Sequence, residues 1–230
     1  MKQVVTRGIV LSRTDYGEAD RIVTLLTPDN GKVRLIAKGV RRPLSKLAGG
    51  IELFSDSNIT YLPSKGSLHT LISSRLITHY GKIVQDIDRT MFGYELLKIL
   101  NKSTEEVVGE EYFDLLNEML SALNDSSIGI DLIELVFSVQ LLDFSGHSPN
   151  LQTDANGKPL QENTNYRFDF DHMTFEPRNN GQFSAGHIKL LRLAASGRRP
   201  SGLQKITGLS ELLPAVVHLV RTLRRQQLRI

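Results

Sequence analysis

The sequence predicts an α+β protein, with an N-terminal five-stranded OB-fold β-barrel followed by an all-helical domain that carries a small irregular or hairpin insertion. Short runs rich in β-branched residues, separated by turn residues, fill the first 80 positions. From about residue 83 apolar residues recur at helical spacing instead. A polar segment with Gly, Pro and Asn, at about 145–182, interrupts the helices. We therefore expect two domains, 1–80 and 81–230.

Five strands are expected in the first domain, at residues 8–11, 21–26, 32–37, 57–61 and 68–72. The segment 27–31 reads Thr-Pro-Asp-Asn-Gly and predicts a hairpin turn, because Pro presets φ and Asn-Gly accepts positive φ. The third strand alternates apolar residues with Arg34 and Lys38, so one face can enter a core while two cations point outward. Five short strands in this length suit a small closed barrel, and the OB-fold commonly binds nucleic acid.

The helical part is expected to contain helices near 83–97, 113–123, 130–144, 187–195 and 209–228. The stretch 130–144 is apolar nearly all round, which indicates a central helix covered by others. Pro214 should kink the last helix or mark its true start, because proline lacks the N–H that a helix interior needs. Within the polar segment, residues 166–170 alternate and 173–175 could form their hairpin partner.

Charge is strongly segregated along the chain, although the net charge is only +3. Residues 1–80 carry a local charge of +6, residues 81–180 carry −11, and residues 181–230 carry +8. Such a pattern creates fields that attract polyanions to the basic ends. Nucleic acid or an acidic partner is therefore expected at the two basic regions.

Composition also excludes several classes of protein. The chain has no cysteine, which removes disulfides, thiolate metal sites and thiol nucleophiles. No stretch approaches the ~18 apolar residues that spanning a bilayer requires, so no membrane partner is expected. Together these features predict a cytoplasmic protein, associated with the nucleoid when it is bound to DNA. No cofactor is expected.

The basic segment from Lys32 to Gly50 is the sharpest candidate binding site. It reads KVRLIAKGVRRPLSKLAGG and contains six cations but no acid. Cations on a strand and its exit loop can follow a phosphate backbone, where each neutralised phosphate releases counterions. Few aromatic residues accompany them, which favours backbone tracking over base stacking. A solvated sheet edge is the alternative interpretation. The cations are Lys32, Arg34, Lys38, Arg41, Arg42 and Lys46.

Two signatures in this region closely resemble the bacterial recombination-mediator and DNA-repair family RecO. Residues 16–24 read Tyr-Gly-Glu-Ala-Asp-Arg-Ile-Val-Thr, and residues 37–43 read Ala-Lys-Gly-Val-Arg-Arg-Pro. The resemblance covers about residues 7–80 well. It implies an OB-fold and a helical domain, binding of single- and double-stranded DNA, and annealing of complementary strands. The positions that match the family's basic signature are Arg21, Lys38, Arg41 and Arg42.

The resemblance also implies partners. These are RecR and the single-stranded-DNA-binding protein SSB, with a functional link to RecA, which the family helps to load onto SSB-covered single strands. The family's helical domain receives the acidic, hydrophobic-ended C-terminal tail of SSB, and cations around an apolar pocket suit such a peptide. Candidate residues for that tail, with a plain solvated face as the alternative, are Arg198, Arg199, Arg221, Arg224 and Arg225.

The sequence departs from the family's pattern in one respect. Many members hold a structural zinc with two Cys pairs, roughly where residues 150–156 and 176–181 lie, and this chain has no cysteine for such a site. Some members also lack the zinc. We expect aromatic packing to hold the 145–182 segment instead, through Tyr166, Phe168, Phe170 and Phe175.

Acidic and histidine residues could in principle form other sites. His147, Asp169, Asp171 and His172 match no common metal-ligand spacing, and Asp often ends strand–turn segments, so structural roles are favoured. Asp15, Glu18 and Asp20 belong to the first inter-strand loop, where Glu18 or Asp20 could pair with Arg21.

We therefore favour a non-catalytic DNA-binding protein over three rivals. One is an RNA- or ribosome-associated OB-fold protein. The second is a metal-dependent nuclease or phosphotransferase that uses the carboxylates of the first loop or of the 169–171 segment. The third is an adaptor whose basic surfaces bind acidic proteins only. No Ser-His-Asp order, phosphate-binding Gly loop or paired-carboxylate site stands out in the sequence.

Overall fold

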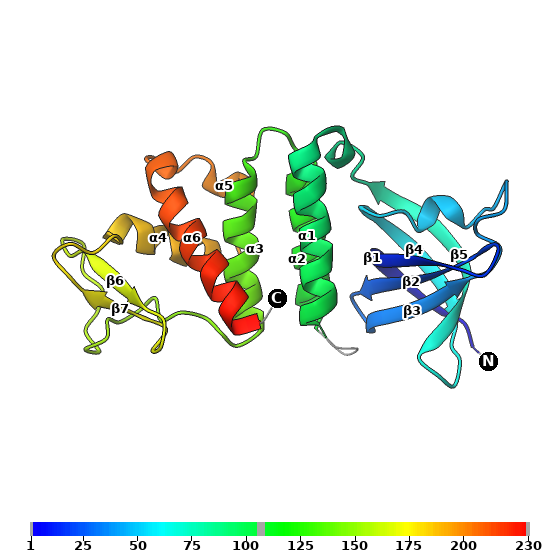
Figure 1. The fold of residues 1–230 in the computed structure, drawn as a ribbon, viewed down its shortest axis with the longest axis horizontal. Coiled ribbons are helices and arrows are strands. Elements are labelled where there is room, and N and C mark those ends of the chain that lie inside the picture. The colour runs from blue at the N-terminus through cyan, green and yellow to red at the C-terminus, as the bar shows by residue number, and fades with distance from the viewer. Residues whose placement is uncertain (1, 105–108, 229–230) are drawn as a thin grey trace. The chain divides into compact units, whose positions relative to one another are not determined.

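The computed structural model describes residues 2–104 and 109–228 (Figure 1). The chain falls into two compact units, unit 1 with residues 1–125 and unit 2 with residues 126–230. Two helices that follow the barrel belong to unit 1, so the boundary between the compact units follows residue 125 rather than residue 80. The expected division into domains 1–80 and 81–230 stays a prediction. None of the described helices is long and apolar enough to cross a membrane.

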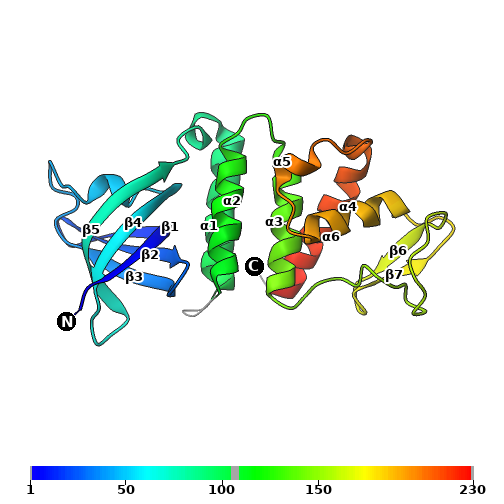
Figure 2. The same ribbon diagram turned by 180° about the vertical axis from the view of Figure 1, so that it is seen from behind.

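The N-terminal strands form a closed five-stranded barrel in the order β1-β2-β3-β5-β4 (Figures 1 and 2). Pairing of β1 with β4 closes the barrel. All neighbouring strands are antiparallel except β3 and β5, which are parallel. This confirms the predicted OB-type barrel and the helical region that follows it. The strands are β1 (Val4–Tyr16), β2 (Asp20–Thr27), β3 (Gly31–Ala37), β4 (Ser55–Leu62) and β5 (Leu68–His79).

The alternation in β3 produces the two faces that the sequence predicts. Val33, Leu35 and Ala37 are buried in the barrel core, whereas Arg34 and the following Lys38 are exposed. The turn at 27–31 joins β2 to β3 with Thr27 opposite Gly31, as expected. The first and fifth strands are longer than the expected 8–11 and 68–72, because pairing with β4 and β2 continues β1 and pairing with β4 continues β5.

Two helices complete unit 1, namely α1 (Ile87–Ser103) and α2 (Glu110–Leu123), which lie side by side in both views (Figures 1 and 2). Helix α1 packs against β1 and against the buried ring of Phe54. Gly93 makes this close approach possible, since a Cβ there would lie 2.8 Å from Cε1 of Phe54. Single 3-10 turns at 48–50 and 83–85 connect the strands and lead into α1.

Unit 2 is built around α3 (Ile130–Phe144), whose residues are buried on nearly all sides, as expected for a central helix. Helices α4 (Ala185–Ala195), α5 (Pro200–Leu203) and α6 (Leu209–Leu228) pack against it. Pro214 lies inside α6, five residues after its start, so the proposal that it marks the true start is wrong. Pro214 is exposed, and because proline has no N–H the helix loses a single backbone hydrogen bond near its start.

A short hairpin, β6 (Tyr166–Asp169) and β7 (Thr174–Pro177), interrupts the helices of unit 2 and confirms the predicted insertion. Tyr166 and Phe168 pack with the fully buried Phe175, with ring centroids 6.3 and 5.0 Å from the ring of Phe175. Phe183, which the sequence interpretation missed, joins the cluster at 5.6 Å. Phe170 contacts Phe168 but stays 38% exposed, so its expected structural role is only partly confirmed.

Candidate nucleic-acid interface

The loop that leaves β3, residues 38–47, carries most of the exposed cations that the sequence singles out. Lys38, Arg41, Arg42 and Lys46 are all exposed there. Backbone hydrogen bonds shape the loop, since the N–H of Arg42 donates to the carbonyl of Gly39 at 3.1 Å and that of Ser45 to the carbonyl of Arg42 at 3.2 Å. We call this segment, together with Arg21, the β3-exit surface.

The loop is anchored to the turn between β1 and β2. The N–H of Gly39 donates to Oδ1 of Asp20 at 2.7 Å, and the N–H of Arg41 donates to the carbonyl of Ala19 at 2.9 Å. Gly39 has φ of 64°, a left-handed conformation that favours glycine and turns the chain out of β3. One carboxylate, of Asp20, and one backbone carbonyl, of Ala19, thus position the basic loop.

Asp15 connects two of the candidate arginines. It lies opposite Arg21 in the pairing of β1 with β2. Its Oδ1 accepts from Nε of Arg21 at 2.8 Å, and its Oδ2 lies 3.4 Å from Nε of Arg41. The hydrogen bond from Arg21 lowers the pKa of Asp15, so the carboxylate remains ionised. One negative charge therefore orients two positive ones, and the surface stays net positive.

This arrangement corrects the expectation that Glu18 or Asp20 pairs with Arg21. The partner is Asp15, because directly opposed residues of antiparallel strands bring their side chains together. Asp20 instead accepts from a backbone N–H. These roles account for two acids of the loop as structural groups.

The remaining cations of the candidate set lie farther along β3. Arg34 is exposed on the outer face, opposite Thr24 of β2 and Leu68 of β5. Lys32 lies at the start of the strand, roughly 20 Å from Lys38 at the usual rise per residue. Its Nζ donates to the carbonyls of Asn101 and Thr104 at 2.8 and 2.7 Å. Lys32 thereby binds the end of α1, and it lies apart from the cations of the β3-exit surface.

The candidate cations of unit 2 divide into two kinds. Arg224 is buried, and its guanidinium contacts Oε1 of Glu134 in α3 at 3.4 Å and Oγ of Ser138 at 3.0 Å. Arg221, which is 39% exposed, forms a two-point ion pair with the same carboxylate. The remaining three residues are exposed, and they are Arg198, Arg199 and Arg225. Binding of the SSB tail by any of these stays a prediction.

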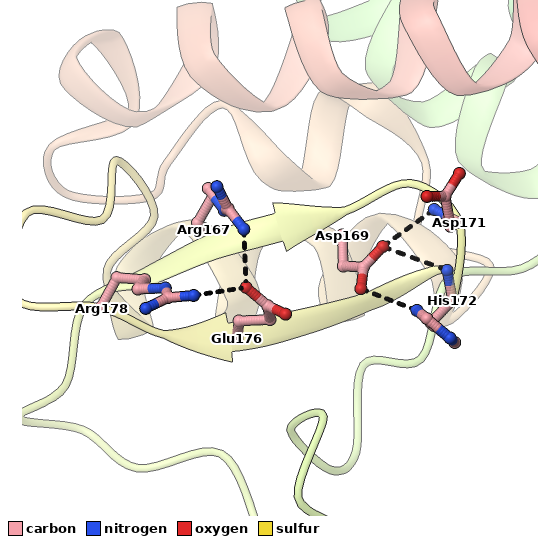
Figure 3. A network of polar contacts seen from close by, with 6 residues as sticks. All are labelled: Arg167, Asp169, Asp171, His172, Glu176 and Arg178. Carbon is pink, nitrogen blue, oxygen red and sulfur yellow. Dashed lines mark hydrogen bonds and ion pairs between the residues drawn. The ribbon is translucent and has the colours of Figure 1, made fainter.

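The acids and histidine of the hairpin bond to one another (Figure 3). Asp169 accepts from the N–H groups of Asp171 and His172 at 2.9 and 3.2 Å, and from Nδ1 of His172 at 2.8 Å. This hydrogen bond lowers the pKa of Asp169 and raises that of His172. Asp171 contributes only its backbone. Across residues 2–104 and 109–228, no group of three or more His, Asp or Glu is arranged to hold a metal ion.

Comparison with known proteins gives matches along almost the whole chain. The family model described as "Recombination protein O N terminal" matches residues 1–80, and "Recombination protein O C terminal" matches residues 84–229. The boundary between the two matches falls just after the barrel.

Individual relatives carry the name "DNA repair protein RecO". The protein from Dehalococcoides mccartyi strain 195 is 33% identical over 178 residues, which is 76% of this chain and 66% of that protein. The protein from Roseiflexus sp. strain RS-1 is 35% identical, over 70% of this chain and 56% of its own length. One from Listeria monocytogenes serotype 4b is 30% identical, over 81% and 74%. The chain thus spans somewhat less than two thirds of the length of the first two relatives.

Proposed function

This chain belongs to the RecO family, and from that premise we propose that it is a non-catalytic DNA-binding recombination mediator in DNA repair. In this proposal the protein binds single- and double-stranded DNA and anneals complementary strands. Together with RecR it helps to load RecA onto single strands covered by SSB. The relatives' name, "DNA repair protein RecO", supports the repair role.

The observation that carries the proposal is the β3-exit surface. Four of its cations, Lys38, Arg41, Arg42 and Lys46, are exposed on a loop whose backbone is tied to the neighbouring turn by the carboxylate of Asp20 and the carbonyl of Ala19, whereas Arg21 is half-buried on β2. A loop fixed in this way loses little conformational freedom when it binds, so its charges need no costly ordering. Guanidinium groups also offer several N–H donors at fixed angles, which suits phosphate oxygens.

The mechanism that follows is electrostatic. Two complementary strands repel each other through their phosphates, and a positively charged surface that binds both lowers this repulsion and raises their local concentration. Among the loop residues 38–47 there is no aromatic side chain, which favours contact with the backbone rather than stacking with bases. Backbone contact is compatible with both single strands and duplexes, and no bond is made or broken in the step.

The exposed cations of unit 2 support the proposed contact with SSB. Arg198 and Arg199 precede α5, and Arg225 lies on α6. All three side chains are exposed, whereas Arg221 is only partly exposed and Arg224 is buried beside Glu134. We therefore assign the proposed peptide contact to Arg198, Arg199 and Arg225 first.

Strand annealing and binding of labelled oligonucleotides by the R41A/R42A variant test the proposal. Each lost phosphate contact should reduce the dependence of log K on log salt by about 0.7 for single strands, so two contacts reduce it by about 1.4. The matched control is R75A/K82A, which removes two exposed cations of unit 1 outside the loop. Annealing should slow in the first variant and persist in the second.

Three results would overturn the proposal or part of it. Unchanged annealing and an unchanged salt dependence in R41A/R42A would remove the loop from the site. A strong preference for RNA over DNA of equal length would favour the RNA-associated alternative. Protein-dependent cleavage of labelled DNA with Mg²⁺ or Mn²⁺ would contradict the non-catalytic assignment.

A further inference from the structure

Unit 2 contains an open groove of about 1310 Å³ beside the β6–β7 hairpin, well separated in sequence from the β3-exit surface. Its walls are the segment before β6 and the segment after β7. The second wall folds back over β6, since Tyr166 and Phe183 exchange two backbone hydrogen bonds at 2.8 and 3.0 Å. Gly181 makes this close approach possible, because a Cβ there would lie 2.4 Å from the backbone of Tyr166. The hairpin cluster of aromatic rings supports the groove from beneath.

Two arginines line the groove and are held by a single carboxylate (Figure 3). Nη2 of Arg167 lies 2.9 Å from Oε2 of Glu176, and Nη2 of Arg178 lies 3.4 Å from the same oxygen. Both arginine side chains are about three-fifths exposed, at 64% and 59%. Within the described residues, Nε and Nη1 of each guanidinium have no partner. The pair therefore presents a net positive charge with free donors.

Amide side chains supply most of the remaining polar lining. They are exposed and, within the part of the chain that the structure describes, none of them makes a side-chain hydrogen bond. Each amide offers both donors and an acceptor, the combination that reads the edges of nucleic-acid bases. No carboxylate lines the groove. The amide residues are Asn163, Asn165, Asn179, Asn180 and Gln182.

One exposed aromatic ring completes the lining. Phe170 follows β6 and is 38% exposed, while its ring packs edge-to-face on Phe168 at 5.1 Å. The buried Phe168 therefore fixes the ring without covering it. A fixed, exposed ring is a platform on which an unstacked base can lie.

We propose that this groove is a second nucleic-acid site, specific for unpaired strands. Arg167 and Arg178 contact phosphates, the amides contact base edges, and Phe170 stacks on a base. A duplex hides its base faces, so stacking on Phe170 requires an unpaired strand, in which the edges of the stacked base are also free for the amides. A peptide is less well matched, since an acidic one would use the amide donors but not their acceptor oxygens, and the apolar lining among the described residues is limited to Phe168, Phe170 and Pro177. The site does not depend on the β3-exit surface.

Equilibrium binding of a fluorescein-labelled mixed-sequence single strand and of the matching duplex tests the site in the full chain. The R167Q/R178Q variant should bind the single strand more weakly and with a salt dependence reduced by about 1.4. F170L keeps an apolar contact with Phe168 but removes the ring, and it should weaken single-strand binding at least about fivefold. Duplex binding should change little in F170L. The matched charge control is K158Q/K205Q, two exposed cations of unit 2 outside the groove.

Crosslinking gives an independent readout. A single strand that carries 5-iododeoxyuridine should crosslink to the peptide containing Phe170 in the wild type, and mass spectrometry would identify the position. Absence of that crosslink, or equal losses in the groove variant and in K158Q/K205Q, would overturn the inference. Thermal melting of each variant checks that unit 2 remains folded.

The result also separates this inference from the proposed function. If R41A/R42A loses binding while the groove variants do not, only the groove assignment fails. If the groove variants lose single-strand binding while R41A/R42A does not, the barrel assignment fails and the groove stands. If the wild type binds no nucleic acid at all, both fail.

Discussion

Replacement of Glu134 by glutamine should destabilise unit 2 strongly, because this carboxylate neutralises a buried cation. Glu134 is 5% exposed by side chain and lies between Arg224, which is 3% exposed, and Arg221, which is 39% exposed. Glutamine keeps the shape and one acceptor oxygen but removes the negative charge. Arg221 can turn toward water, whereas Arg224 cannot. Removal of one partner from a buried ion pair typically costs about 3–5 kcal/mol.

The assay is native-state hydrogen exchange of peptides from α3 and α6, read by mass spectrometry. This measurement isolates unit 2 from the barrel, whose separate unfolding would complicate a single transition. A loss of about 3 kcal/mol corresponds to exchange faster by roughly a hundredfold, at about 1.4 kcal/mol for each factor of ten. The peptides of the barrel should be unaffected.

The matched control is E211Q, which removes an exposed acid from the first turn of α6. Its loss costs only the interaction with the helix dipole, about 0.3–1 kcal/mol. If E134Q lowers the free energy of unfolding of unit 2 by no more than E211Q does, the ion pair does not hold α6 on α3.

Two further predictions concern packing and pH. G93A should destabilise α1 and its contact with the barrel by about 1–3 kcal/mol, because the new methyl group meets Phe54, and thermal denaturation would detect it. Burial lowers the pKa of His187, whose Nδ1 accepts from the N–H of Ser184 at the start of α4. The contribution of neutral His187 to the stability of the fold is therefore fully present above the ordinary histidine pKa of about 6.5. It is lost as the pH falls through the lowered pKa of the folded state. H187Q keeps an acceptor without titrating, so the protection factors in α4, which correct for the intrinsic pH dependence of amide exchange, should lose this pH dependence. A pH profile like that of the wild type would refute this.

The barrel was predictable because local signals agree with one another. The turn at 27–31 sets the β2–β3 hairpin, and the alternation of β3 assigns its faces. Both signals act over a few residues, where backbone geometry leaves few choices. The outer parts of β1 and β5 escaped prediction because residues such as 4–7 and 73–79 mix apolar and polar side chains without regular alternation. They become strands through pairing with neighbours that local sequence does not reveal.

The partners of the arginines were less predictable, since they depend on tertiary contacts. Arg221 meets Glu134 across 87 positions of sequence, and a helical wheel of α6 alone places Arg221 and Arg224 on a seemingly free basic face. One signal was available. Glu134 is a lone acid in the middle of an almost entirely apolar helix, and a carboxylate in such a place requires a cation. The groove beside the hairpin gave no comparable signal, because its amides resemble those of an ordinary solvated loop.

A single carboxylate between two guanidiniums recurs three times in the described structure, and burial decides what each arrangement can do. Asp15 holds Arg21 and Arg41, Glu176 holds Arg167 and Arg178, and Glu134 holds Arg221 and Arg224. Each triad has a net charge of +1. Where the acid is buried with a guanidinium, as at Glu134, the charge serves to fasten two helices. At Asp15 and Glu176 the acid itself is accessible, at 50% and 25%, and it orients the arginines without removing them from water. Burial of the acid, rather than the number of cations, therefore distinguishes the structural ion pair at Glu134 from the two surfaces that we propose bind phosphates.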